Sequence, residues 1–435
     1  MKIITEKFAL LVGFLITLTL LVGGFNICGI ALFKWVLLVL CYLCGISTRC
    51  VRLKKYNRAF LVLIISIAIS IIGAANTGYI EVSFIVGNFV NIILITITVK
   101  MMESAGDSVM LSFVRGIELS CYFQGIYCAL QYLFRSVMDY SLNRFIFDDI
   151  LHINDEAALR DIINEGVFVE YGINSHPSVL IPIIIIMMCF GKNKTMSITL
   201  SIIIVVLSRN STTAIAFVLC LIMPLIIQVM ENIVEKRKSK FNNKKFLKVF
   251  LGIAACIVIL FTSGWYLKLF EVMNRTWVRI IGNSAASDYS TRTHTLYYTS
   301  IIIILSRMNL FNVIFGNGFN SSGDVATHMG IIINDAKNWA IEADPVDLLY
   351  GIGIFGIIVF YYWFLRSIRR AYKWGNEYMV FAITILVCGI TYRIQYLWVI
   401  MFELVLFRLI SKNIDITKME SNSRMFLGDR RKRYE

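Results

Sequence analysis

Long apolar runs separated by short polar or basic segments make up most of the chain. A helix needs about 20 largely apolar residues to cross a bilayer, whereas a membrane β-strand alternates polar and apolar residues. Blocks such as IPIIIIMMCF and SIIIVVL do not alternate. The pattern predicts an all-α polytopic integral membrane protein with about twelve transmembrane helices. The expected spans are residues 8–25, 30–47, 59–75, 80–99, 109–134, 178–190, 196–208, 211–230, 248–266, 346–365, 377–391 and 394–410.

Basic residues set the expected orientation of these spans. They gather at 48–58, 231–248, 366–373 and in the tail that ends DRRKRYE. With both termini in the cytoplasm, all four segments fall on the cytoplasmic side, in agreement with the positive-inside rule. Two long loops and Arg209 then lie outside. The net charge of +14 is expected to meet anionic lipid headgroups rather than nucleic acid.

Composition agrees with a membrane protein. Hydrophobic residues make up 58% of the 435 residues and charged residues 16%, compared with about 25% charged in soluble domains. The first span has no cleavage site and many spans follow it, so we expect a retained anchor. The predicted organisation is N-terminal transmembrane helices at 1–134, a first extracytoplasmic loop at 135–177, central transmembrane helices at 178–266, a large extracytoplasmic loop at 267–345, C-terminal transmembrane helices at 346–411 and a basic cytoplasmic tail at 412–435.

Motifs for metal or nucleotide chemistry are missing from the sequence. It contains no HExxH or DxD motif, no Walker loop or GxGxxG pattern opens a helix, and its four histidines have no metal-ligand spacing. Most of the ten cysteines lie in expected spans, where a buried small apolar side chain is the better interpretation. We therefore expect no metal and no cofactor, and any chemistry would use residues at the outer membrane boundary.

A polar turn in VVLSRNSTTAIAF, residues 205–217, interrupts two apolar segments. Arg209 is its one charged residue, and the hydroxyls of Ser208, Ser211 and Thr212 flank it. One interpretation is that the arginine ends a helix and extends to the membrane surface. The other is that its guanidinium binds phosphate oxygens in a bidentate manner and always keeps its charge.

The second long loop adds more cationic side chains. Arg275 and Arg279 are four residues apart and so share one helix face, where they either anchor lipid headgroups or bind substrate. Arg292 and His294 precede an apolar segment at 296–305, which is too short to cross a bilayer. We expect this segment to be re-entrant or interfacial. The cluster NVIFGNGFNSSGD that follows predicts a turn.

The same loop ends at a predicted helix start, IEADPVDLLYGIGIFG. Asp344 before Pro345 predicts an N-cap, and Asp347 falls in the first turn, so capping explains both carboxylates and catalysis is the alternative. Glu342 has no capping duty, which favours a functional role. Close packing on a neighbouring helix is expected at Gly351, Gly353 and Gly356.

Arginines and carboxylates that converge at one membrane face suit one class of reaction. Guanidinium groups neutralise a pyrophosphate leaving group without a metal. A nearby carboxylate or imidazole accepts the proton of an attacking sugar hydroxyl. These groups are the ones needed for glycosyl transfer from a lipid pyrophosphate.

Four stretches in the second half of the chain carry a resemblance to a known family. They are NSHPSVLIPIII, LSRNSTTAIAFVL, Arg292 followed by an apolar segment and FGNGF, and IEADPVDLLYGIGIFGIIVF. In this order the chain resembles bacterial O-antigen and capsule repeat-unit polymerases, which are relatives of the O-antigen ligases. The first half matches only in hydropathy. The ligases usually have a histidine where this chain has residues 342–344, which favours a polymerase.

The resemblance implies a metal-independent, inverting C-type glycosyltransferase in the bacterial inner (plasma) membrane, with its active site on the outer face. The donor would be the growing glycan on polyprenyl (undecaprenyl) pyrophosphate, and the acceptor a single lipid-linked repeat unit. It further implies a chain-length regulator and a flippase as partners. By residue, it implies pyrophosphate binding by Arg209, Arg292 and Arg279, a catalytic base at Glu342 with Asp344 and His294 as alternatives, and support from Ser208, Ser211, Thr212 and His176.

Three other interpretations remain open. An O-antigen ligase would use the same chemistry with a different acceptor. A flippase for the lipid-linked unit would show internal pseudo-symmetry and charges inside the bundle, and the sequence has no detectable repeat. A non-catalytic assembly partner would not depend on any single arginine. His176, in the loop sequence NSHPS, also has a structural interpretation.

Overall fold

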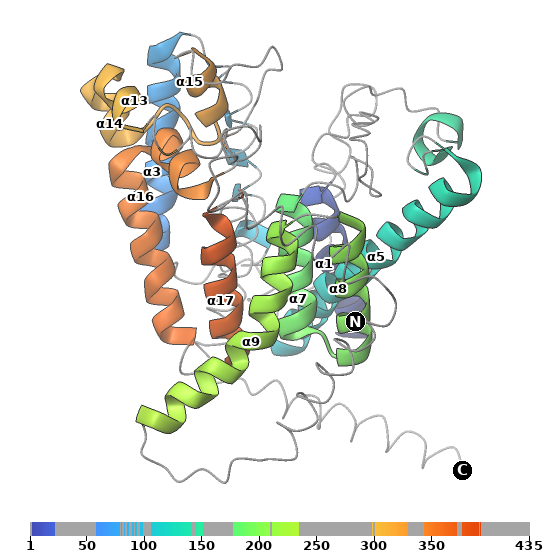
Figure 1. Ribbon diagram of the computed structural model, residues 1–435. Coiled ribbons are helices and arrows are strands. Elements are labelled where there is room, and N and C mark those ends of the chain that lie inside the picture. Colours follow the sequence, from blue (N-terminus) through green and yellow to red (C-terminus); the bar gives the residue numbers. More distant parts are fainter. Residues whose placement is uncertain are drawn as a thin grey trace, which may run out of the picture.

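The computed structural model describes a helical protein (Figure 1). No strand occurs among the residues that it describes. The described residues are 2–21, 58–78, 80, 82, 85–86, 89–90, 92–93, 96–98, 106–140, 142, 145–150, 177–208, 211–234, 298, 301–328, 341, 343–371, 376–390 and 392. The predicted all-α class is confirmed for this part of the chain.

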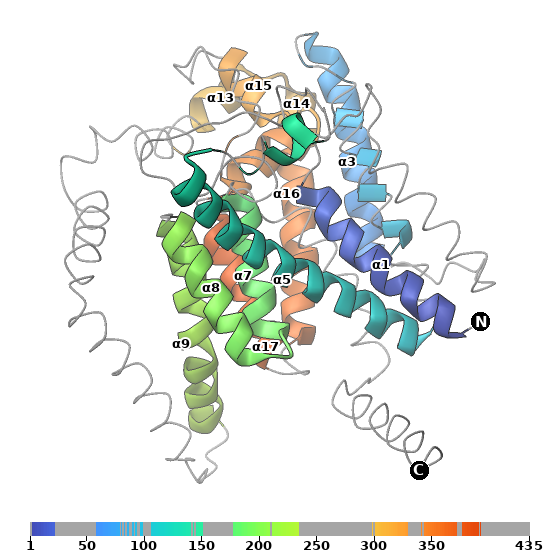
Figure 2. The same ribbon diagram turned by 90° about the vertical axis from the view of Figure 1, so that its right-hand side faces the viewer.

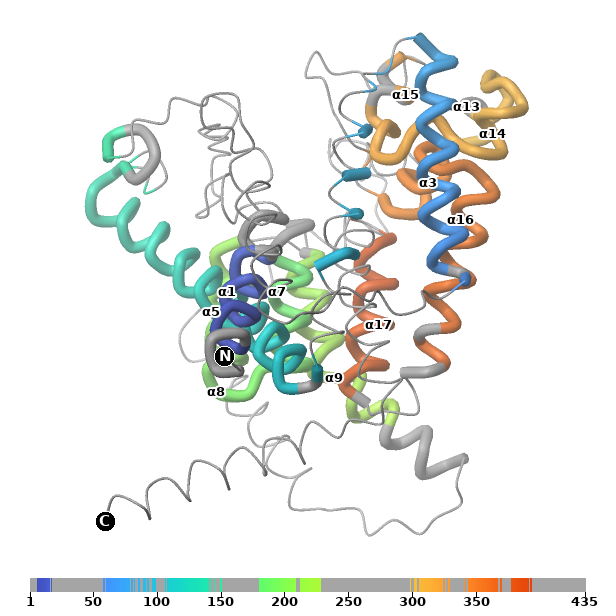
Figure 3. Tube along the Cα trace, turned by 180° about the vertical axis from the view of Figure 1, so that it is seen from behind, coloured from blue at the N-terminus to red at the C-terminus, as the bar shows by residue number. Residues whose placement is uncertain are grey.

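The described helices pack in two groups. The first contains α1 (Lys2–Leu21), α5 (Asp107–Met138), α7 (Pro177–Phe190), α8 (Lys194–Ser208) and α9 (Ser211–Val234). The second contains α3 (Arg58–Thr77), α14 (Leu310–Phe315), α15 (Ser322–His328) and α16 (Asp344–Ala371). The helix α17 (Asn376–Gly389) packs against α7 and α9 in the first group and α16 in the second, and Figure 3 shows it between them.

The core of the first group is α7. All of its residues from Leu180 to Met187 are buried. A helix that is apolar on every side is buried on every side, and α7 is covered by α5, α8, α9 and α17. Figure 2 shows α1 lying along α5 at the edge of this group, in agreement with their extensive packing.

Chain direction alternates through the central helices. Three residues, 191–193, connect α7 to α8, and two residues connect α8 to α9, so consecutive helices run antiparallel. In Figure 1, α9 and α16 begin at the upper end of the bundle, and α8 and α17 end there. The ends of α8 and α17 and the starts of α9 and α16 therefore face the same side.

Two described helices are long and apolar enough to cross a membrane. They are the segments Phe60–Thr77 in α3 and Asp344–Arg366 in α16. Shorter apolar helices occur at Leu180–Phe190, Lys194–Ser208, Thr212–Ile227 and Glu377–Gly389. The expected spans at 30–47, 248–266 and 394–410 lie outside the described residues. The total of about twelve spans, the orientation and the domain boundaries therefore stay predictions.

The helices described in the two long loops are short. The first loop contains a π-helix, Phe145–Ile150, and the second contains α13 (Ile301–Arg307), α14 and α15. The seven residues of α13 cannot cross a bilayer, which agrees with the expectation that the segment 296–305 does not span. The turn predicted in NVIFGNGFNSSGD lies between α14 and α15.

The start and the course of α16 differ from the prediction. The Ala343 carbonyl accepts its first backbone hydrogen bonds, from Val346 N–H at 3.1 Å and Asp347 N–H at 2.8 Å, so the cap is Ala343 and Asp344 lies in the first turn. The expected continuous span at 346–365 is also interrupted. At Gly353 the backbone is non-helical, with φ 70° and ψ −177°, a conformation open mainly to glycine.

Close contact between α3 and the second loop requires a glycine. A Cβ atom added to Gly73 would lie 1.9 Å from the carbonyl oxygen of Gly316, a backbone atom that cannot turn aside. The side-chain amide of Asn312 also donates to the Gly73 carbonyl at 3.3 Å. The α3 backbone is therefore part of the support for the turn at 316–321.

We predict that Gly73→Ala destabilises the protein by about 1–3 kcal/mol, because the added methyl group overpacks this contact. Thermal unfolding in detergent would measure the change. Ala75→Val, on the same helix at an exposed position, is the control and is expected to unfold near the wild-type temperature. Equal unfolding temperatures for Gly73→Ala and wild type would contradict the prediction.

Candidate functional site

Four of the ten predicted site residues lie in the described part of the chain. They are Ser208, Ser211, Thr212 and Asp344. The other predicted residues lie outside the described residues: His176, Arg209, Arg279, Arg292, His294 and Glu342. Of these six positions, the structure describes residues directly next to His176, Arg209 and Glu342.

The turn between α8 and α9 is held by hydroxyl groups. Ser208 is the last residue of α8, and its Oγ lies 2.9 Å from Oγ1 of Thr213 in α9. Ser208, Thr212 and Thr213 are all buried. The bond joins the two helices directly across the pair of residues, 209 and 210, that connects them. Thr213 is a contributor that the sequence analysis left out of its site.

The break in α16 is capped by the turn at 316–318. A non-helical residue at 353 interrupts the backbone ladder of the helix, and other donors then serve the carbonyls before it. The N–H groups of Asn317 and Gly318 donate to the carbonyls of Tyr350 and Gly351 at 2.9 and 3.0 Å. The side-chain amide of Asn317 also donates to the Tyr350 carbonyl, at 3.1 Å. The turn predicted from FGNGF thus completes the hydrogen bonding of an interrupted helix.

Side chains from α3 and α14 hold this turn in place. Asn312 Nδ2 donates to Asn317 Oδ1 at 2.7 Å, and the Phe319 N–H donates to Ser70 Oγ at 3.1 Å. The added Cβ of Gly353 would lie 2.3 Å from the Ile314 carbonyl oxygen. The expected close packing of the glycines in α16 is confirmed, with the turn at 316–318 as the neighbour at Gly353.

A serine and a carboxylate connect the start of α16 to the start of α15. The Ser322 hydroxyl donates to Asp347 Oδ1 and accepts from the Ile341 N–H at 3.1 Å. Both side chains are buried, at 0% and 1% exposure. The Asp347 carboxylate thus contacts the start of a second helix, and Ser322 is a residue that the sequence analysis missed.

Asp344 is fully buried in the first turn of α16. Tyr298, which follows His294 by four positions, lies near it. Burial and, next, the negative charge of Asp344 raise the pKa of Tyr298 above its usual value of 10. The Tyr298 hydroxyl donates to the Ile390 carbonyl at the end of α17, at 2.6 Å. The second loop is thus attached to the end of α17 beside the start of α16.

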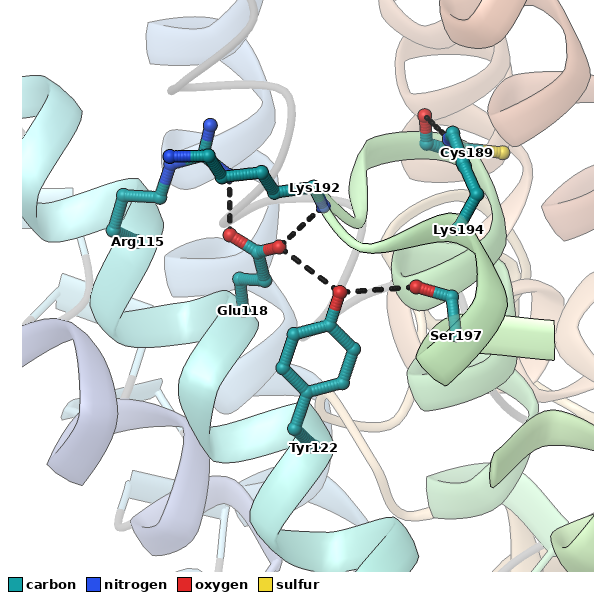
Figure 4. Close-up of polar contacts among 7 residues, drawn as sticks. All are labelled: Arg115, Glu118, Tyr122, Cys189, Lys192, Lys194 and Ser197. Atoms are coloured by element: carbon teal, nitrogen blue, oxygen red, sulfur yellow. Dashed lines mark hydrogen bonds and ion pairs between the residues drawn. The ribbon is translucent and has the colours of Figure 1, made fainter. Parts of the chain in front are cut away.

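A second buried polar cluster surrounds Glu118 in the middle of α5 (Figure 4). Its carboxylate accepts from the Arg115 guanidinium, from the Tyr122 hydroxyl at 3.1 Å and from the Lys192 N–H at 2.5 Å. The Tyr122 hydroxyl is also 3.0 Å from Ser197 Oγ. These contacts fasten α5 to the turn between α7 and α8, which lies one length of α8 away from Ser208.

The contacts of the Glu118 cluster join three helices, α5, α7 and α8, near the turn at 191–193. A signal for it was present in the sequence, because an acidic residue in the expected span 109–134 is costly in hydrocarbon unless it is paired. Nearby, Lys194 Nζ donates to the Met188 carbonyl at 3.1 Å, a favourable place for a positive charge at the end of α7.

Neither comparison with known proteins gave a relative: no protein-family model matches the chain, and no curated protein matches it. Within the described ranges, no group of three histidine, cysteine, aspartate or glutamate side chains is arranged to hold a metal ion.

We predict that Ser208 and Thr213 are energetically coupled. Ser208→Ala and Thr213→Val should each lower the free energy of unfolding by about 1 kcal/mol, because each removes the same buried hydrogen bond. The double variant should lose little more than either single variant. Unfolding in detergent would measure all three.

The matched control is Ser136→Ala, which removes an exposed hydroxyl that bonds only within its own helix, to Tyr132. It should change the free energy of unfolding by less than about 0.5 kcal/mol. Additive losses for Ser208→Ala and Thr213→Val would contradict the predicted coupling.

Proposed function

We propose that the protein is an O-antigen or capsule repeat-unit polymerase of the bacterial plasma membrane. The enzyme transfers a growing glycan from polyprenyl pyrophosphate to the terminal sugar of one lipid-linked repeat unit. The reaction takes place at the outer face of the membrane and needs no metal. A flippase supplies the substrate and a chain-length regulator acts on the product.

One observation carries this proposal. The segments that flank the proposed phosphate-binding Arg209 and the proposed base Glu342 face the same side of the helix bundle. In Figure 1, α8 ends and α16 begins at the upper end of the bundle; Ser208 is the last residue of α8 and Asp344 the first of α16. A glycosyl transfer needs a cation at the leaving group and a base at the attacking hydroxyl on one side of a membrane.

The local structure of both segments supports the same conclusion. The hydroxyl pair Ser208–Thr213 holds the ends of α8 and α9 together on either side of Arg209. The start of α16 is held by Ser322 and lies beside Tyr298, which is attached to α17. Rigid supporting elements are what a preorganised binding site requires.

In the proposed reaction, Arg209 and Arg292 bind the pyrophosphate, with Arg279 as a third candidate. A guanidinium group suits this role because its planar donors match phosphate oxygens and its charge persists at any physiological pH. Glu342 removes the proton of the acceptor hydroxyl, and Asp344 and His294 are the alternative bases. The sugar carbon then exchanges its bond to the pyrophosphate oxygen for a bond to the acceptor oxygen.

We predict that deletion of the gene removes the ladder of long glycans and leaves single repeat units on their anchor. A gel of surface polysaccharide from the deletion strain beside its parent would test this. Full-length glycan that stays on the lipid carrier would indicate a ligase instead. Absence of glycan beyond the cytoplasmic leaflet would indicate a flippase, and an unchanged ladder would refute a role in glycan assembly.

Variants of Arg209 in the complemented deletion strain test the proposed site. We expect Arg209→Ala and Arg209→Lys to lower polymer formation by about tenfold to a hundredfold, because lysine cannot make the bidentate contact. Arg366→Lys, an exposed arginine on the predicted cytoplasmic side, is the control and should leave the ladder unchanged. Full polymer length in both Arg209 variants at normal protein levels would refute this assignment.

A further inference from the structure

Neighbouring residues occupy the donor and one acceptor site of the Ser322 hydroxyl. A serine hydroxyl offers one donor and two acceptor sites. The Ile341 N–H occupies an acceptor site at 3.1 Å, and the hydroxyl proton goes to Asp347 Oδ1. Because Ser322 is fully buried, water does not compete for these contacts.

Ser322 and Asp347 together hold the backbone on both sides of position 342. Ser322 fixes the N–H of Ile341, and the backbone N–H of Asp347 fixes the Ala343 carbonyl at 2.8 Å. The side chain of Asp347 accepts the hydrogen bond of the Ser322 hydroxyl, and its main-chain N–H donates to the Ala343 carbonyl. Ile341 and Ala343 are thereby both attached to one buried pair.

The energetics favour this arrangement. Asp347 lies in the first turn of α16, where the helix dipole stabilises a negative charge. A hydrogen bond to a charged acceptor is stronger than one between neutral groups. The Ser322–Asp347 contact is therefore suited to hold Ile341, which bonds to the same Ser322 hydroxyl, close to the start of α16.

We propose that Ser322 and Asp347 form a positioning pair: they hold Ile341 and Ala343, the residues on either side of the proposed base Glu342, and thereby orient that base. The inference rests on the proposed function. Neither residue touches the reacting atoms, so both are positioning residues. Loss of the pair should lower kcat and leave KM nearly unchanged, because the arginines that bind the pyrophosphate lie on other segments.

Initial rates of glycan elongation in membrane vesicles test the pair. The substrate is the lipid-linked repeat unit extracted from the deletion strain, varied in concentration. We expect Ser322→Ala and Asp347→Leu each to lower kcat by about tenfold to a hundredfold with KM within about twofold of wild type. The double variant should be no slower than the slower single variant, because both remove one contact.

Conservative variants separate positioning from other roles. Ser322→Thr keeps the hydroxyl, and Asp347→Asn keeps an oxygen that accepts the Ser322 proton, so both should retain kcat within about threefold to fivefold. If Asp347→Asn is as slow as Asp347→Leu, the charge itself is required and the positioning pair is refuted. Wild-type rates in Ser322→Ala would refute it equally.

The outcome distinguishes this inference from the proposed function. Protein amount and unfolding temperature in each vesicle preparation identify variants that fail to fold, and the two conservative variants remain informative in that case. If wild-type vesicles elongate the glycan and Arg209→Ala vesicles do not, while Ser322→Ala is normal, only the positioning pair fails. If wild-type vesicles do not elongate the extracted lipid, the proposed function fails and the inference with it.

Discussion

The second helix group depends on satisfying the backbone carbonyls that the break in α16 exposes. In an apolar environment an unpaired carbonyl costs several kcal/mol, so an interrupted helix survives only where protein donors replace its own. Asn317 and Gly318 supply these donors to Tyr350 and Gly351. Their placement in turn requires the contacts from Asn312 and Ser70 and the absence of a side chain at Gly73. The break and its cap are therefore one unit built from three distant parts of the sequence.

Local signals made the helical class and the turn at 316–321 predictable. Apolar run length indicates helices that can span a membrane, and Gly-Asn clusters indicate turns, without knowledge of any partner. The break at Gly353 was not predictable in the same way, because a glycine in an apolar helix equally suits close helix packing. The N-cap at Asp344 was wrong by one residue for a related reason: Pro345 is compatible with either of the first helical positions, and the hydrogen bond to Ala343 decides between them.

The supporting residues of the candidate site could not be found from sequence because their partners are distant or ordinary. Ser322 is part of a serine-glycine stretch that predicts only a turn, and its partners are 19 and 25 residues away. Thr213 is one of several neighbouring hydroxyls, and its bond to Ser208 depends on the way α8 and α9 pack. Glu118 was different, since a carboxylate in an expected span demands a partner. The cost of an unpaired carboxylate in a membrane span marks Glu118 as paired, but it does not indicate which residues are its partners.

The position of α17 has a consequence for the spacing of the proposed reacting groups. Among the described helices it is the one that packs substantially against both groups, touching α9 on one side and α16 on the other. In the proposed enzyme, the phosphate-binding arginine follows from α8 and the base precedes α16, so these groups belong to different halves of the molecule. A larger or smaller side chain on α17 would therefore change the spacing between these two groups. Such a change would leave every proposed reacting group in place and alter only the distance between them.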